Sequence, residues 1–131
     1  MNTYNKTKVL NCVNHKLTKD QEYDLKQLGE VTNLIDIDKE LFSKIANSPF
    51  ELARIKELAR NVYAILLQGS YTHIHLPIGS PAFMDVLSNE LGKTSIYRVY
   101  SHTERASKDI VNADGSITKT SVFDYKGLII I

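Results

Sequence analysis

The sequence predicts an α/β domain with a mainly parallel sheet, helices on both faces and a C-terminal β-hairpin. Short apolar runs alternate with amphipathic runs over the first hundred residues, which is the pattern of βαβ units. Capping residues and glycines bound the amphipathic runs. Near the end of the chain, the turn pair Asp114-Gly115 stands between two extended stretches. With 131 residues, we expect one domain spanning 1–131.

The strands are predicted from short runs of apolar and β-branched residues. Those expected to be parallel are Lys8–Val13, Val31–Ile37, Thr72–Ile78 and Ser95–Tyr100. After them, Lys108–Val111 and Ser116–Phe123 flank the turn pair and predict the antiparallel hairpin.

The helices are predicted from their start and stop signals. In chain order, the starts are the T-x-x-Q box of Thr18 and Gln21, the capping Asp38, the Ser48-Pro49-Phe50-Glu51 box, and Ser80-Pro81. The predicted stops are Gly29, Gly69 and Gly92, with Gly69 expected as a left-handed cap. Strands that alternate with such helices imply right-handed crossovers and a Rossmann-like domain.

Composition excludes several classes of protein. Cys12 is the single cysteine, so neither an internal disulfide nor a cysteine-built zinc site forms. No apolar run is long enough for a membrane span, and the polar start does not resemble a secretory signal. We therefore expect a cytoplasmic protein that has no membrane partner. The net charge of +1 argues against long nucleic acid as a partner.

Ligands of parallel α/β sheets bind beyond the carboxyl ends of the strands. Three of the segments expected there are rich in hydroxyls, imidazoles and cations: Asn14-His15-Lys16-Leu17-Thr18, Gly79-Ser80-Pro81-Ala82-Phe83 and Ser101-His102-Thr103-Glu104-Arg105. A glycine followed by a helix start can bring backbone N–H groups close to an anion. Plain helix capping explains Gly79 and Ser80 equally well.

The imidazoles and cations of these segments are candidates for proton transfer and phosphate binding. His15 and His102 can exchange protons near neutral pH, while Lys16 and Arg105 can hold phosphate. An exposed polar loop or a surface ion pair explains the same residues without function. His73 and His75 alternate on one strand, but two ligands do not make a metal site, so no metal or other cofactor is predicted.

Two of these stretches, together with a looser central one, resemble small CRISPR-associated proteins with CARF-like Rossmann folds. The stretches are Asn14-His15-Lys16-Leu17-Thr18-Lys19-Asp20-Gln21, then Leu76 to Phe83, and finally Ser101 to Arg105 with Asp114-Gly115-Ser116, Lys119 and Ser121-Val122-Phe123. The resemblance implies a homodimeric ring nuclease of type III systems. Such proteins bind a cyclic oligoadenylate, usually cyclic tetra-adenylate, and cleave it without a metal through attack by a ribose 2′-hydroxyl.

Within that chemistry the candidate residues take expected roles. His15, His102 and Arg105 are the catalytic candidates, His15 or His102 as general base or acid and Arg105 to neutralise the phosphorane. The ligand-binding candidates are Asn14, Lys16, Thr18, Gly79, Ser80, Phe83, Ser101 and Thr103. Two alternatives remain open: a non-catalytic sensor or sink for the same nucleotide, and a small assembly subunit whose tail, Leu128 to Ile131, forms an interface.

Overall fold

A computed structural model describes residues 7–47 and 50–131. Within these residues the elements, in chain order, are β1 (Lys8–Asn11), α1 (Lys19–Leu28), β2 (Glu30–Asn33), α2 (Leu34–Ile37), α3 (Lys39–Ala46), α4 (Leu52–Gln68), β3 (His73–Leu76), α5 (Pro81–Leu91), β4 (Tyr97–Val111) and β5 (Ile117–Ile130). The mixed α/β class predicted from the alternation of strands and helices is confirmed.

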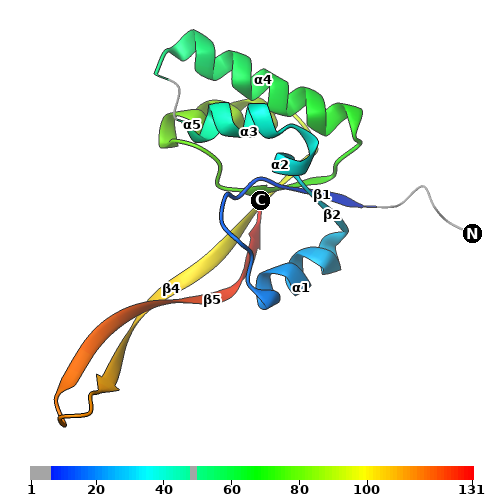
Figure 1. The fold of residues 1–131 in the computed structure, drawn as a ribbon. Coiled ribbons are helices and arrows are strands. Elements are labelled where there is room, and N and C mark those ends of the chain that lie inside the picture. The colour runs from blue at the N-terminus through cyan, green and yellow to red at the C-terminus, as the bar shows by residue number, and fades with distance from the viewer. Residues whose placement is uncertain (1–6, 48–49) are drawn as a thin grey trace, which may run out of the picture.

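The sheet has the strand order β2-β1-β3-β4-β5 (Figure 1). The first four strands in this order are parallel, and β5 is antiparallel to β4. A mainly parallel sheet with a C-terminal antiparallel hairpin is therefore confirmed. Because the chain runs from β1 outward to β2 and then back past β1 to β3, the order reverses between β1 and β3.

Helices cover both faces of the sheet, as the sequence predicted. In Figure 1, α1 lies on one side, and α3, α4 and α5 lie on the other. Leu10 and Ile74 point into the larger apolar cluster with the second group of helices, while Val9 and Val99 pack with Leu25 of α1. Alternate residues of each strand thus enter opposite cores. Each fully buried aliphatic side chain of this kind contributes roughly 1.5–3 kcal/mol.

The predicted helix starts are largely confirmed because they depend on local chemistry. Thr18 and Gln21 form the complete capping box of α1, Asp38 accepts from the N–H of Leu41 at the start of α3, and Ser80 caps α5. Ser48 and Pro49 lie outside the described residues. The residue that precedes α4 is Glu51, whose side chain makes no capping hydrogen bond.

Two local predictions are wrong. The strand expected over 31–37 ends at Asn33, and Leu34 to Ile37 form the short helix α2, because Leu34 turns into the larger core and is fully buried there. Gly69 is not left-handed: its φ is −87°, and the left-handed residue is Ser70 with φ 56°. A Cβ on Gly69 would lie 2.2 Å from the ring of Tyr71, so this glycine makes room for that ring.

The terminal hairpin is much longer than predicted. The strand expected over 95–100 and the first hairpin strand are one strand, β4, which pairs with β5 from Val99 to Val111. Beyond the sheet the two strands continue as a ribbon that projects from the body (Figure 1). We call residues 104–124 of this ribbon the arm. The tail residue Leu128 pairs with Ser101 inside β5.

Gly79 serves the fold at the start of α5. Its φ is +69°, a left-handed conformation that side chains with a Cβ disfavour. A Cβ at this position would lie 2.7 Å from Cγ2 of the fully buried Ile45 on α3. The glycine therefore allows the loop after β3 to turn tightly against α3.

Gly79→Ala should destabilise the domain by about 1–3 kcal/mol, because it combines left-handed strain with a clash against Ile45. Gly92→Ala is the matched control: Gly92 has φ −62°, and its added Cβ would meet its nearest heavy atom at an ordinary 3.4 Å. Urea unfolding of both variants measures the difference. Equal stabilities would contradict this account of Gly79.

Candidate functional site

The reversal of strand order between β1 and β3 marks the place where ligands of open parallel sheets bind. The loop after β1 leads to α1 on one face, and the loop after β3 leads to α5 on the other. The two loops therefore diverge at the carboxyl edge of the sheet. β4 also ends its parallel pairing here, at Tyr100, and continues into the hairpin.

A pocket of about 470 Å³ lies at this edge, and we call it the rim pocket. Its lining comes from the β1–α1 loop, α1, the end of β3 and the middle parts of β4 and β5: Val13, His15, Lys16, Thr18, Gln21, His75, Leu76, Pro77, Ser101, Thr103, Phe123 and Tyr125. Among these described residues a lysine and two imidazoles are present, and a carboxylate is absent. The volume falls in the range of small-molecule sites, roughly 300–1,000 Å³.

Two lining residues of the rim pocket, His75 and Ser101, belong to a row of hydrogen-bonded polar side chains that crosses four strands. We call Asn33, Asn11, His75 and Ser101 the polar row. Asn11 pairs in register with both Asn33 and His75, and Ser101 lies two residues beyond Val99, the register partner of His75. All four side chains therefore project from the same face of the sheet.

The contacts along the polar row are short. Asn11 Nδ2 donates to Asn33 Oδ1 at 3.0 Å, and Asn11 Oδ1 lies 2.8 Å from Nδ1 of the fully buried His75. On the other side, His75 Nε2 lies 2.7 Å from Ser101 Oγ. Gln21 of α1 adds a fifth member, because its Nε2 donates to Ser101 Oγ at 3.1 Å.

The directions of these bonds fix the tautomer of His75. Since the NH₂ group of Asn11 donates to Asn33, its carbonyl oxygen faces His75 and accepts a hydrogen bond from Nδ1–H. A neutral imidazole with Nδ1–H has its lone pair on Nε2, so the Ser101 hydroxyl donates to it. His75 is thus held neutral between two oriented partners.

Burial is the main cause that keeps His75 uncharged. Burial, and then the charge of nearby His15, lowers the pKa of His75 to about 4 from 6.5. The pKa of the Tyr125 phenol, on the opposite wall, is raised by burial and by its hydrogen bond to Asp24 Oδ2, which is 2.7 Å long. At neutral pH the lining is therefore positive or neutral.

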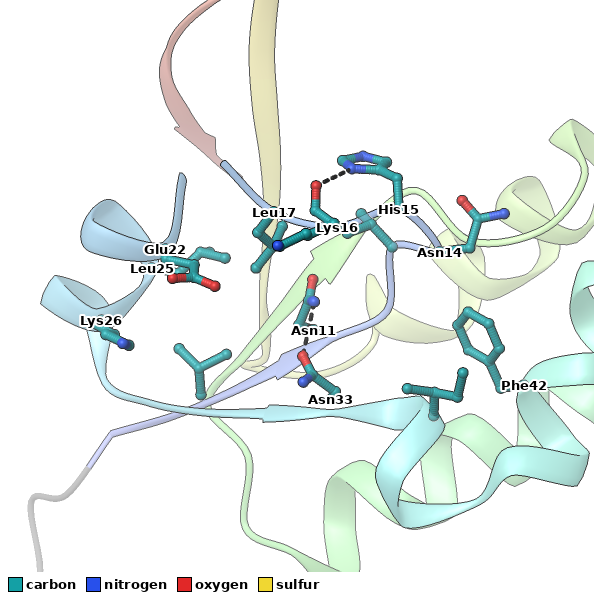
Figure 2. A pocket seen from close by; sticks show the side chains of 13 residues that line it. Asn11, Asn14, His15, Lys16, Leu17, Glu22, Leu25, Lys26, Asn33 and Phe42 are labelled. Carbon is teal, nitrogen blue, oxygen red and sulfur yellow. Dashed lines mark hydrogen bonds between the residues drawn. The ribbon is translucent and has the colours of Figure 1, made fainter. Parts of the chain in front are cut away.

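A second pocket of about 350 Å³ adjoins the rim pocket on the other side of the β1–α1 loop, and we call it the side pocket. Figure 2 shows Asn11 and Asn33 meeting below the loop that carries His15 and Lys16. Both of these loop residues line both pockets. His15 Nδ1 lies 3.2 Å from the carbonyl oxygen of Lys16, which holds the imidazole beside its own loop.

The structure brings several predicted site residues together. The rim pocket is lined by His15, Lys16, Thr18, Ser101 and Thr103, and the side pocket by Asn14, His15 and Lys16. Strand alternation explains which part of the Ser101–Arg105 segment takes part: Ser101 and Thr103 lie on the pocket face of β4.

The placement of His102 beside Ser101 in one cluster is wrong. On an extended strand His102 faces away from its neighbours Ser101 and Thr103, and its Nε2 instead lies 3.6 Å from Glu104 on that opposite face. Arg105 returns to the pocket face but lies farther out, on the arm. Its guanidinium is 5.3 Å from the ring centroid of Phe123, a lining residue of the rim pocket.

The expected contribution of the Gly79–Phe83 segment is also corrected. Ser80 Oγ accepts from the N–H of Phe83 at 3.2 Å, so its oxygen serves as the helix cap. Phe83 is fully buried in the larger core. None of Gly79, Ser80 or Phe83 lines either pocket, because the loop after β3 turns toward the helices on the opposite face.

Sequence reasoning misses the central members of the site, Asn11, His75 and Gln21. The alternation of His75 with His73 suggests two ligands of an incomplete metal site, yet the two histidines have different surroundings. His73 lies at the start of β3, stacked on Tyr97 with ring centroids 5.0 Å apart. The sequence signal that could have identified these residues is a polar residue near the carboxyl end of each apolar strand.

Neither a metal cluster nor a membrane helix is found in the described part of the chain. Over residues 7–47 and 50–131, the His, Cys, Asp and Glu side chains form no group of three or more that could hold a metal ion. The helices within the same residues are too short or too polar to cross a bilayer.

Comparison with known proteins identifies a family. Residues 7–128 match the model of a family described as the uncharacterized protein MJ1673 family. No curated protein and no solved structure matches the chain.

The lowered pKa of His75 predicts acid sensitivity. The unfolded chain binds a proton at His75 below pH 6.5, whereas the folded protein binds it only near pH 4. The contribution of neutral His75 to the free energy of unfolding is therefore complete above pH 6.5 and is lost as the pH falls toward 4. The loss should be about 3 kcal/mol. Urea unfolding of wild type and His75→Gln at pH 7 and pH 4.5 tests this. Parallel pH dependences in the two proteins would contradict it.

Proposed function

The chain belongs to the uncharacterized protein MJ1673 family, and we propose that it binds a cyclic oligoadenylate and cleaves it, with cyclic tetra-adenylate as the preferred ring. The observation that carries the proposal is the rim pocket. At the switch point of a parallel sheet it joins a lysine, an exposed imidazole and hydroxyls without an opposing carboxylate among its described lining residues. This combination favours a small anion that also carries hydrogen-bonding groups.

Phosphate recognition is assigned to the β1–α1 loop. Lys16 and His15 are exposed at the junction of the two pockets, so both can approach a phosphate from the loop. The hydroxyls of Thr18 and Thr103 also belong to residues that line the rim pocket and can donate to phosphate oxygens. A lysine acts here as a point charge, whose hydrogen bonds to phosphate are stronger than neutral ones.

Base recognition is assigned to the hairpin side of the pocket. Phe123 is 68% exposed, which leaves much of its ring free for stacking, and Tyr125 lies beside it in the lining. Stacking of a base on an aromatic ring contributes roughly 1–3 kcal/mol. Arg105, already stacked on Phe123, can reach a phosphate next to such a base.

The fold and the arm support a Rossmann-like, CARF-like domain that works as a homodimer. The order β2-β1-β3-β4 is that of doubly wound sheets with a ligand site between β1 and β3. A pocket of about 470 Å³ encloses only part of a tetranucleotide ring, so two pockets related by a two-fold axis suit the ligand. Apolar side chains exposed along the arm, including Val111, Ile117 and Phe123, suit contact with a second copy.

The proposed reaction is attack by a ribose 2′-hydroxyl on the adjacent phosphorus, which expels the 5′-oxygen and leaves a 2′,3′-cyclic phosphate. Lys16 and Arg105 would neutralise the charge that develops on the phosphorane, and His15 would give a proton to the departing oxygen. His102 takes no part, since it projects from the opposite face of β4. The pocket residues also align the ribose for in-line attack.

Incubation with cyclic tri-, tetra- and hexa-adenylate in EDTA, followed by chromatography and parallel binding measurements, tests the function. Conversion of one ring to linear products that end in a 2′,3′-cyclic phosphate is the expected result. Binding without conversion, with and without added metals, would replace the enzyme by a sensor or sink. The absence of both binding and conversion would exclude the proposal, and co-elution only with another chain would then favour an assembly subunit.

Lys16→Ala should weaken binding of cyclic tetra-adenylate by about 10- to 100-fold, because a hydrogen bond to a charged group contributes about 1.5–3 kcal/mol. The control is Lys44→Ala on α3, which removes an equal charge from a surface pair with Glu40 at 3.0 Å. Calorimetric titration of both variants at constant salt separates local contact from net charge. Equal weakening by the two substitutions would refute a phosphate contact at Lys16.

A further inference from the structure

Ser101 is the member of the polar row that reaches the rim pocket with hydrogen-bonding capacity left over. Its hydroxyl proton is committed to His75 Nε2 at 2.7 Å, and one oxygen lone pair accepts from Gln21 Nε2 at 3.1 Å. A serine oxygen has a second lone pair. Since Ser101 is half-buried and lines the rim pocket, it offers a bound ligand an acceptor and no donor.

The neighbours of Ser101 hold this arrangement in place. Gln21 cannot turn its amide around, because its Oε1 already accepts from the N–H of Thr18 at 2.9 Å. His75 keeps its proton on Nδ1 because Asn11 Oδ1 accepts a hydrogen bond from that N–H group. Asn11 in turn is fixed by Asn33, whose Nδ2 donates to Asp36 Oδ2 at 3.3 Å. All the hydrogen bonds from Gln21 to Asp36 thus run in one direction.

Resting on the proposed function, we infer that Ser101 accepts the proton of the attacking ribose 2′-hydroxyl and passes its own proton to His75. Ser101 is then a catalytic residue, while His75 and Asn11 act through it. Of the hydroxyl side chains that line the rim pocket, Ser101 is the one bonded to an imidazole among the described residues. A serine, a histidine and an amide in this order have the geometry of a hydroxyl activated by a base.

Two proton transfers accompany the exchange of bonds at phosphorus. The 2′-O–H bond breaks as its proton moves to Ser101 Oγ, and the original hydroxyl proton of Ser101 moves to His75 Nε2. The 2′-oxygen forms its bond to phosphorus as the bond from phosphorus to the 5′-oxygen breaks, and the 5′-oxygen takes a proton from protonated His15. After product release, the proton on His75 leaves through Ser101 to water, and His15 regains one from water.

A bound phosphate makes this transfer more favourable. In the empty pocket, burial opposes the imidazolium form of His75, and the charge of His15 opposes it further. The titratable groups around His75 in the pocket are His15 and Lys16 on the β1–α1 loop and Tyr125 on β5. A phosphate held by the two cationic groups cancels their repulsion and adds a negative charge near the imidazole, which favours its protonated form.

Steady-state cleavage of cyclic tetra-adenylate in EDTA by Ser101→Ala and His75→Gln tests the inference. Loss of a positioned proton acceptor should lower kcat by roughly 10²- to 10⁴-fold in both variants, with KM nearly unchanged. Ser101→Thr keeps a hydroxyl on a strand position that suits threonine, so it should recover most of the lost kcat. The control is Ser107→Ala, which removes an exposed hydroxyl of the arm farther along β4.

The outcomes separate the inference from the function on which it depends. If wild type cleaves the ring and Ser101→Ala keeps its kcat, the inference is wrong and the function stands. The inference is also wrong if Ser101→Ala raises KM alone, because Ser101 would then only bind. If wild type cleaves no ring, both fail. Circular dichroism checks folding, and if His75→Gln does not fold, the comparison of Ser101→Ala with Ser101→Thr decides the matter.

Discussion

The structure of the site depends on one buried imidazole that is kept neutral. His75 lies near the carboxyl end of the central strand β3 with no exposed surface, and an unpaired polar group there would cost about 1–3 kcal/mol or more. Asn11 and Ser101 supply one acceptor and one donor from the two flanking strands. Together with the bond from Asn11 to Asn33, these bonds link four strands at the edge where the loops diverge. Strand register and the composition of the pocket floor are therefore a single constraint.

Around this fixed floor, the walls of the rim pocket have different characters. The β1–α1 loop contributes charge through His15 and Lys16, and the hairpin contributes aromatic surface through Phe123 and Tyr125. The protein as a whole has a net charge of only +1, so the proposed binding of an anion depends on the local arrangement of charges. The described lining of the rim pocket contains no carboxylate. The nearby carboxylate of Asp24 accepts a hydrogen bond from Tyr125. The chemistry proposed for the pocket uses the hydrogen-bonded floor, the β1–α1 loop and the hairpin.

The sequence predicts well what local interactions determine. The capping box of Thr18 and the cap of Ser80 depend on residues three positions apart, and both are present. Prediction is poorer where the position of a side chain depends on contacts between segments that are distant in the sequence. The polar row depends on cross-strand register between Asn11 and His75, 64 residues apart, which no local pattern encodes. The separation of His102 from Ser101 arises because β4 continues as one extended strand, and neighbours on a strand face opposite sides. Gly79 lies apart from the rim pocket, and its tight contact with Ile45 is invisible in the sequence.

The length of β4 has a mechanical consequence. One continuous strand runs from Tyr97 inside the sheet to Val111 at the far part of the projecting ribbon, with Ser101 and Thr103 between the two regions. The ribbon is bonded only along its own pair of strands over most of its length, while the inner end of β4 is anchored against β3. The register shift next to His102 lies between the anchored and the projecting parts of β4. A displacement of the far end of the ribbon would therefore move the pocket wall formed by β4 and β5 relative to the hydrogen-bonded polar row.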